Sequence, residues 1–125
     1  MSSLNHLRVL IVGGSSGIGF AVAEAAVAAD AHVTIASRSE DKLVTAAQQL
    51  GPGTETAVLD TADEAALESF FASHDVFDHV VVSAAQTPTG PLRKLALHDA
   101  KSAMESKFWG AYRAARAAGI AEGAR

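Results

Sequence analysis

The sequence contains no cysteine and few aromatic residues, with one Trp, one Tyr and five Phe among 125 residues. The absence of cysteine excludes disulfides and thiolate metal sites, and it is typical of a reducing compartment. The formal net charge is −4, and no concentrated basic segment of the kind that binds nucleic acid is present. The five histidines (6, 32, 74, 79 and 98) lack metal-ligand spacing. We therefore expect neither a nucleic-acid partner nor a bound metal.

Long apolar runs are also lacking, since none approaches the ~20 residues that cross a bilayer. The first residues contain no basic leader before an apolar stretch and no small-residue cleavage site. These absences predict no membrane partner and a cytoplasmic location. A length of 125 residues suits one domain, which we expect to span residues 1–125.

Short aliphatic runs alternate with amphipathic segments along the whole chain. Residues 9–12, 32–36, 56–59 and 78–83 are expected to be strands. Helices are expected at 15–29, after a Ser39 cap, after a Thr61 capping box, and at 98–118 with Gly119 as a breaker. This order predicts an α/β fold, a three-layer doubly wound parallel sheet with strands in the order 3-2-1-4.

Four glycines lie within seven residues at the junction of the first strand and the first helix. Glycines leave no Cβ in the path of a phosphate, and free N–H groups of a first helical turn point toward an anion. The alternative is a glycine-rich turn without a ligand. The expected phosphate-binding residues are Gly13, Ser15, Ser16, Gly17, Ile18 and Gly19.

Ser37 and Arg38 end the second strand, about 20 residues beyond the glycine loop. An acidic residue at this place would accept hydrogen bonds from the ribose 2′-hydroxyl of NAD. A guanidinium instead matches a 2′-phosphate in charge and in bidentate geometry. The sequence therefore favours NADP over NAD as cofactor, the alternative being an exposed arginine in a loop.

Asp60 and Thr61 follow the third strand. In the expected topology Asp60 faces the adenine side of the cleft, and both residues are candidates for binding the cofactor there. An equally good interpretation is that Asp60 helps to start the next helix beside Thr61.

These residues resemble the short-chain dehydrogenase/reductase family from Val9 to about Arg116. The family's Thr-Gly-x-x-x-Gly-x-Gly motif falls on residues 12–19, with Val12 in place of Thr, and its aspartate after strand three falls on Asp60. Its Asn-Asn-Ala-Gly segment falls on residues 83–86, where only Ala85 is shared. The resemblance implies that Ser83, Ala84 and Ala85 also belong to the cofactor site.

The resemblance covers only the N-terminal Rossmann half of the family. It places Lys107 where the family's catalytic tetrad has Asn, and it leaves the catalytic Ser and the Tyr-x-x-x-Lys pair without counterparts. Tyr112 and Arg116 repeat the spacing on the wrong helix, and we interpret Tyr112, like Phe108 and Trp109, as a packing residue. The resemblance thus implies the NADP(H)-binding part of an oxidoreductase for a carbonyl/alcohol pair, truncated before strand five and inactive alone. Its small carbonyl or alcohol substrate would bind only in a full-length parent.

An exposed fourth strand would form an apolar sheet edge, and such edges pair with other chains. We therefore expect a homo-oligomer formed through helix 98–118 or through the edge of strand 79–83. Two alternatives to an oxidoreductase remain open: a dinucleotide-binding module without chemistry, and a structural oligomerising module.

Overall fold

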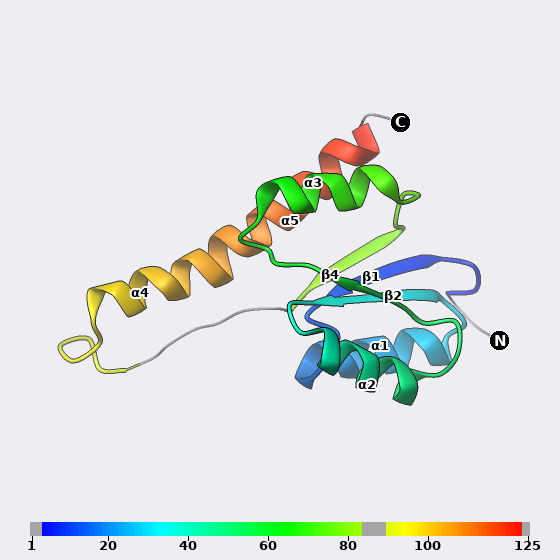
Figure 1. The fold of residues 1–125 in the computed structure, drawn as a ribbon, viewed down its shortest axis with the longest axis horizontal. Coiled ribbons are helices and arrows are strands. Elements are labelled where there is room, and N and C mark those ends of the chain that lie inside the picture. The colour runs from blue at the N-terminus through cyan, green and yellow to red at the C-terminus, as the bar shows by residue number, and fades with distance from the viewer. Residues whose placement is uncertain (1–3, 84–89, 124–125) are drawn as a thin grey trace.

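The computed structural model describes residues 4–83 and 90–123. Its four-stranded parallel sheet has the order β3-β2-β1-β4 (Figure 1). The strands are β1 (Arg8–Val12), β2 (His32–Ser37), β3 (Glu55–Val58) and β4 (His79–Val82). The predicted fold class and strand order are therefore confirmed, and each expected strand lies within a residue or two of its predicted place.

Helices cover both faces of the sheet. Helices α1 (Gly17–Ala28) and α2 (Glu40–Leu50) lie on one face, whereas α3 (Glu64–Ser73) and α5 (Gly110–Gly123) lie on the other (Figure 1). Successive side chains of a strand point to opposite faces. Accordingly Val9 and Ile11 of β1 pack in the α1–α2 core, and Leu10 and Val12 pack in the α3–α5 core.

Local side-chain caps fix where α2 and α3 begin. Ser39 caps α2 as predicted, since its hydroxyl accepts a hydrogen bond from the Lys42 amide. The predicted capping box at Thr61 is wrong, because Asp63 is the N-cap of α3 and accepts from the Ala66 amide. The Asp60 carboxylate accepts from the Ala62 amide, and this turn delays the helix.

Helix α1 begins at Gly17, two residues later than predicted, because Ser16 is still extended. Its buried face consists of Gly19, Ala23 and Ala26. The Ile18 side chain, in contrast, is 78% exposed. The small buried residues allow α1 to lie close to the sheet.

The last predicted helix is a longer rod of three segments. Helix α4 (Leu97–Met104) continues through a π-helical turn, η1 (Glu105–Trp109), into α5. The predicted break at Gly119 is wrong, because α5 runs through it to Gly123. A glycine inside a helix costs only about 1 kcal/mol relative to alanine, and the alanine-rich neighbours of Gly119 favour the helix.

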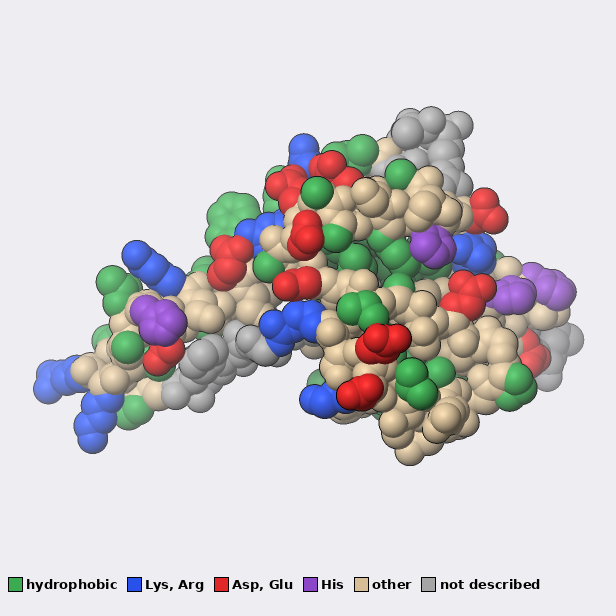
Figure 2. Space-filling model, in the orientation of Figure 1, with side chains coloured by type: hydrophobic (Ala, Val, Ile, Leu, Met, Phe, Trp, Pro, Cys, Tyr) green, Lys and Arg blue, Asp and Glu red, His purple; other side chains and the backbone are tan. Residues whose placement is uncertain are grey.

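Three aromatic side chains of this rod, interpreted from sequence as packing residues, are largely exposed. Phe108 and Tyr112 are each 53% exposed and Trp109 is 46% exposed. They contact one another edge to face instead of entering the core. The valines of strand β4 are likewise only half-buried, at the edge of the described sheet. Hydrophobic side chains project from the rod in Figure 2.

Replacing Gly119 by alanine tests the continuous helix. Gly119 has no atom within 4 Å of an added Cβ, so Gly119→Ala is expected to stabilise the chain by about 0.5–1 kcal/mol. Gly51→Ala is the matched control, because Gly51 ends α2 at a φ of +107° and alanine there is expected to lower stability by about 1–3 kcal/mol. Thermal unfolding of both variants provides the measurement. A lower melting temperature for Gly119→Ala would contradict the continuous helix.

Candidate functional site: a cleft at the carboxyl ends of the strands

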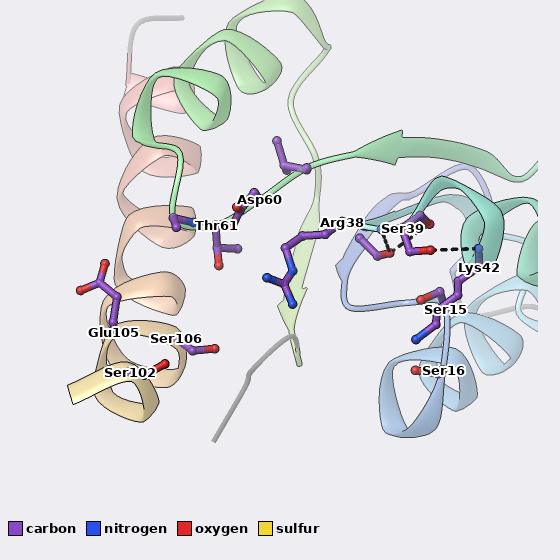
Figure 3. Close-up of a pocket in the computed structure, with 13 residues that line it drawn as sticks. Ser15, Ser16, Arg38, Ser39, Lys42, Asp60, Thr61, Ser102, Glu105 and Ser106 are labelled. Carbon is purple, nitrogen blue, oxygen red and sulfur yellow. Dashed lines mark hydrogen bonds between the residues drawn. The ribbon is translucent and has the colours of Figure 1, made fainter. Parts of the chain in front are cut away.

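A cleft of about 390 Å³ opens at the carboxyl ends of β1, β2 and β3. Ligands of open α/β sheets bind at this edge. Residues from the loops after three strands and from the α4–η1 segment converge on the cleft (Figure 3). It is lined by Ser15, Ser16, Ser37, Arg38, Ser39, Lys42, Leu59, Asp60, Thr61, Ala62, Ser102, Glu105 and Ser106.

The loop after β1 is shaped by glycines at three places. Gly13 and Gly17 have φ angles of +95° and +59°, a region that side-chain-bearing residues rarely adopt. A Cβ on Gly19 would lie 2.0 Å from the Gly13 carbonyl oxygen and 2.5 Å from Ser83 Oγ. Glycine at position 19 is therefore required for α1 to begin directly beside its own loop and the end of β4.

The first turn of α1 can accept an anion. Its N-cap residue Ser16 makes no side-chain capping hydrogen bond, and the turn contains no acidic residue. The first N–H groups of a helix have no partner within the helix, and the helix dipole adds a partial positive charge there. Ser15 and Ser16 line the cleft, whereas the Ile18 side chain is exposed outside it. Of the predicted loop residues, the structure brings these two hydroxyls to the cleft.

Arg38 occupies the middle of the cleft, between the α1 side and the α4–η1 side (Figure 3). The loop that presents it is tied by hydroxyls: Ser37 Oγ accepts a hydrogen bond from the Ser39 amide at 3.1 Å. Lys42 adds a second cation to the lining. Across the side chains described in residues 4–83 and 90–120, no carboxylate forms an ion pair with Arg38. Its charge is available to an anionic ligand.

The loop after β3 places Asp60 and Thr61 together on the cleft wall. Asp60 Oδ1 accepts a hydrogen bond from the Ala62 amide at 2.9 Å, so this carboxylate shapes the turn before α3. A Cβ on Gly110 would lie 2.7 Å from Thr61 Oγ1. Thr61 therefore joins the β3–α3 loop closely to the start of α5.

Other predicted site residues lie away from the cleft lining. Ser83 follows β4, and its amide donates to the Val12 carbonyl oxygen at 2.8 Å while its hydroxyl donates to the Gly13 carbonyl oxygen at 3.3 Å. Ser83 thus stabilises the start of the glycine loop through these two hydrogen bonds. Ala84 and Ala85 lie outside the described residues. Lys107 is exposed on η1.

Several lining residues were not identified from the sequence: Ser39, Lys42, Leu59, Ala62, Ser102, Glu105 and Ser106. Ser39 and Lys42 are near Arg38 in sequence, and their proximity to a cationic loop was an available signal. Ser102, Glu105 and Ser106 lie far from Arg38 in the sequence, and no local motif identifies them as site residues. They reach the cleft only because the α4–η1–α5 rod docks beside the β3–α3 loop.

The described ranges hold neither a metal-binding cluster nor a membrane-spanning helix. No three His, Cys, Asp or Glu side chains there lie close enough together to hold a metal ion. None of the helices in those ranges is long and apolar enough to cross a membrane.

The family model described as short chain dehydrogenase matches residues 7–120. A 3-dehydrosphinganine reductase of Arabidopsis thaliana is 40% identical over 87 residues, which are 68% of this chain and 22% of that protein. The chain therefore spans about a fifth of the length of this relative.

Solved structures show the same arrangement. A short chain dehydrogenase/reductase family protein superimposes with a TM-score of 0.87 at 26% identity, over 98% of this chain and 52% of that one. A variant of actinorhodin polyketide ketoreductase, crystallised with NADPH, gives a TM-score of 0.87 at 22% identity, over 98% of this chain and 50% of that one. The chain spans about half the length of these structures, and the second likeness concerns the fold alone.

Substituting Gly19 tests the close approach at the glycine loop. A methyl group at this position overlaps backbone atoms, so Gly19→Ala is expected to destabilise the chain by about 1–3 kcal/mol. Chemical unfolding of Gly19→Ala measures this loss. Ser83→Ala is the companion variant: it removes the Oγ that would lie 2.5 Å from the new Cβ but leaves the Gly13 carbonyl in place. The double variant should therefore recover only part of the loss. An unchanged unfolding midpoint in Gly19→Ala would contradict the packing described here.

Proposed function

The chain belongs to the short-chain dehydrogenase/reductase family, and on this premise we propose that its residues bind NADP(H) in the cleft described above. One observation carries the proposal. Ser15, the uncapped α1 N-cap residue Ser16 and Arg38 all line the same cavity. A dinucleotide with a 2′-phosphate has two anionic groups, a pyrophosphate and a phosphomonoester, and this cleft offers a separate binding element for each.

The pyrophosphate is proposed to lie against the amides at the start of α1. Gly13, Gly17 and Gly19 permit the backbone approach, and the Ser15 and Ser16 hydroxyls are available as donors. The backbone of this loop is constrained without a ligand, because positive φ angles and the close approach at Gly19 restrict its conformation. Little ordering of the protein is then required on binding.

Arg38 is proposed to bind the 2′-phosphate, for which a guanidinium is suited by charge and by its paired N–H donors. Ser37 holds the loop, and Lys42 supplies a second positive charge at the same wall. Asp60 and Thr61 are proposed to line the adenine side. Ser83 supports the glycine loop in this proposal, and Ala84 and Ala85 complete the set proposed from the family resemblance.

The chemistry proposed for the parent protein is reversible reduction of a carbonyl to an alcohol. The bound cofactor would supply a hydride to the carbonyl carbon, while an acid supplies a proton to its oxygen. The family's catalytic Ser and Tyr-x-x-x-Lys pair have no counterparts among these 125 residues. We therefore propose that these residues bind the dinucleotide but do not oxidise it. A binding module without chemistry is the second candidate for the same reason.

Thermal unfolding with added dinucleotide tests cofactor choice. A ligand at 100 times its Kd stabilises the folded state by about 2.7 kcal/mol, which corresponds to several degrees for a domain of this size. NADPH is expected to raise the melting temperature more than NADH at equal concentration. Equal protection by the two would remove the role given to Arg38, and no protection by either at millimolar concentration would remove the proposed function.

Charge reversal at position 38 tests the same residue directly. Arg38→Asp is expected to weaken NADPH binding by at least about tenfold and to reverse the preference toward NADH, because the aspartate repels a phosphate and accepts from a ribose hydroxyl. Arg93→Asp makes the same change in net charge at an exposed residue that does not line the cleft. Calorimetric titration should show nearly unchanged affinity for this control. A comparable loss in both variants would identify a general charge effect.

Self-association through the aromatic face of η1 and the start of α5 is a further proposal. Phe108 and Tyr112 flank Trp109 on a helix face that the described part of the chain leaves about half exposed. Exposed aromatic clusters of this kind are typical of protein interfaces. The open edge of β4 is the alternative contact.

Sedimentation analysis of a double variant tests this face. Phe108→Ser combined with Tyr112→Ser is expected to weaken dimerisation by at least about tenfold, because aromatic residues contribute much of the binding energy at interfaces. Val44→Ser alters an exposed apolar residue on α2, in the opposite layer, and should leave association unchanged. A wild-type chain that remains monomeric at high concentration would contradict the proposal.

A further inference from the structure

One wall of the cleft is formed by the α4–η1 part of the rod, opposite the glycine loop (Figure 3). Ser102, Glu105 and Ser106 line the cleft from this rod, and Asp60 and Thr61 line it from the neighbouring loop. These two segments are far apart in sequence and belong to different elements. The width of the cleft on this side therefore depends on what fastens the rod to the β3–α3 loop.

Arg113 makes that connection with both of its terminal nitrogens. Its Nη1 donates a hydrogen bond to the Thr61 carbonyl oxygen at 3.4 Å, and its Nη2 forms an ion pair with Glu105 Oε1. The Arg113 side chain is only 21% exposed, so these contacts are partly shielded from solvent. One guanidinium thus holds a cleft-lining loop and a cleft-lining helix residue at the same time.

The neighbouring backbone shows how close this contact is. Gly110 starts α5 one turn before Arg113, and a Cβ on it would lie 2.7 Å from Thr61 Oγ1. The π-helical turn η1 ends directly before Gly110. A π-turn contains an extra residue and changes the direction of side chains relative to a regular helix, and such turns are common at functional sites. Here Glu105 is the first residue of the turn, and its side chain pairs with Arg113, which follows the turn in α5.

We propose that Arg113 is a positioning residue of the nucleotide cleft, fixing the distance between the β3–α3 loop and η1 so that the adenine half of a dinucleotide fits between them. The inference rests on the proposed binding of NADP(H). Arg113 is not among the cleft-lining residues, so it acts through Thr61 and Glu105 and not by touching the ligand.

A second arginine of α5 supplies a matched control. Arg116 lies one turn further along and forms ion pairs with Glu64 at 3.2 Å and Glu68 at 3.7 Å. It joins α5 to α3, as Arg113 joins α5 to the loop before α3, but neither of its partners lines the cleft. If both arginines served only to hold α5 in place, substituting either one should change ligand affinity by the same factor.

The test compares NADPH affinity by calorimetric titration in the wild-type chain and in Arg113→Gln and Arg116→Gln. Arg113→Gln is expected to raise the Kd about tenfold, the effect of one lost charged hydrogen bond, whereas Arg116→Gln should change it less than about twofold. Arg113→Lys retains the charge but not the two-pronged contact, and its Kd should lie between wild type and Arg113→Gln.

The isolated adenine half of the cofactor, 2′,5′-ADP, tests whether the altered wall acts on that half. The affinity of Arg113→Gln for 2′,5′-ADP should fall as much as its affinity for NADPH, because the altered wall is assigned to the adenine half. Gly110→Ala keeps every charge and forces Thr61 to move, and it should also raise the Kd for both ligands. This second variant keeps the proposal testable if Arg113→Gln does not fold.

The outcomes separate the two proposals. A wild-type chain that binds neither NADPH nor 2′,5′-ADP at millimolar concentration overturns the proposed function, and the inference with it. A wild-type chain that binds, together with equal affinities for Arg113→Gln and Arg116→Gln, overturns only the positioning role. Normal affinity in Gly110→Ala would likewise show that the position of Thr61 does not determine the cleft.

Discussion

The contact between Gly19 and the Gly13 carbonyl determines the geometry of the whole binding edge. Because no Cβ separates them, α1 begins immediately beside its own loop, and Ser83 at the end of β4 packs against the same point. The start of α1 thereby lies beside the cleft that Ser15 and Ser16 line. A larger residue at position 19 would push α1 away from both the glycine loop and the end of β4. The positions of these three elements therefore all depend on the absence of a side chain at Gly19.

Polar side chains around this edge divide into two roles. Ser37, Ser39 and Asp60 use their oxygens to fix the backbone of the loops that carry them. Arg38 is held by such a loop but makes no ion pair within the described part of the chain. The protein thus satisfies its own turns locally and leaves a cation directed at the cavity. This arrangement suits a ligand that brings negative charge with it.

Much of the fold could be predicted because hydrophobic periodicity and capping residues are local signals. The strand order and the Ser39 cap both agree with the sequence analysis. The errors arose where two local signals compete or where burial depends on distant partners. The turn formed by the Asp60 carboxylate and the Ala62 amide delays the start of α3 beyond Thr61. Gly119 lies inside α5 and does not end it. The aromatic residues of η1 and α5 were expected to pack in a core, but they are about half exposed on the surface of the rod.

The sequence by itself determined the glycine loop, the cation at the end of the second strand and the alternation that builds a parallel sheet. Those features depend on steric freedom, charge and periodicity, which are properties of neighbouring residues. Only the tertiary structure decided that Ser102, Glu105 and Ser106 form the opposite wall, and that Arg113 joins this wall to Thr61. Such contacts depend on how a helix docks across the sheet and on a π-turn within it, and no short stretch of sequence specifies either one.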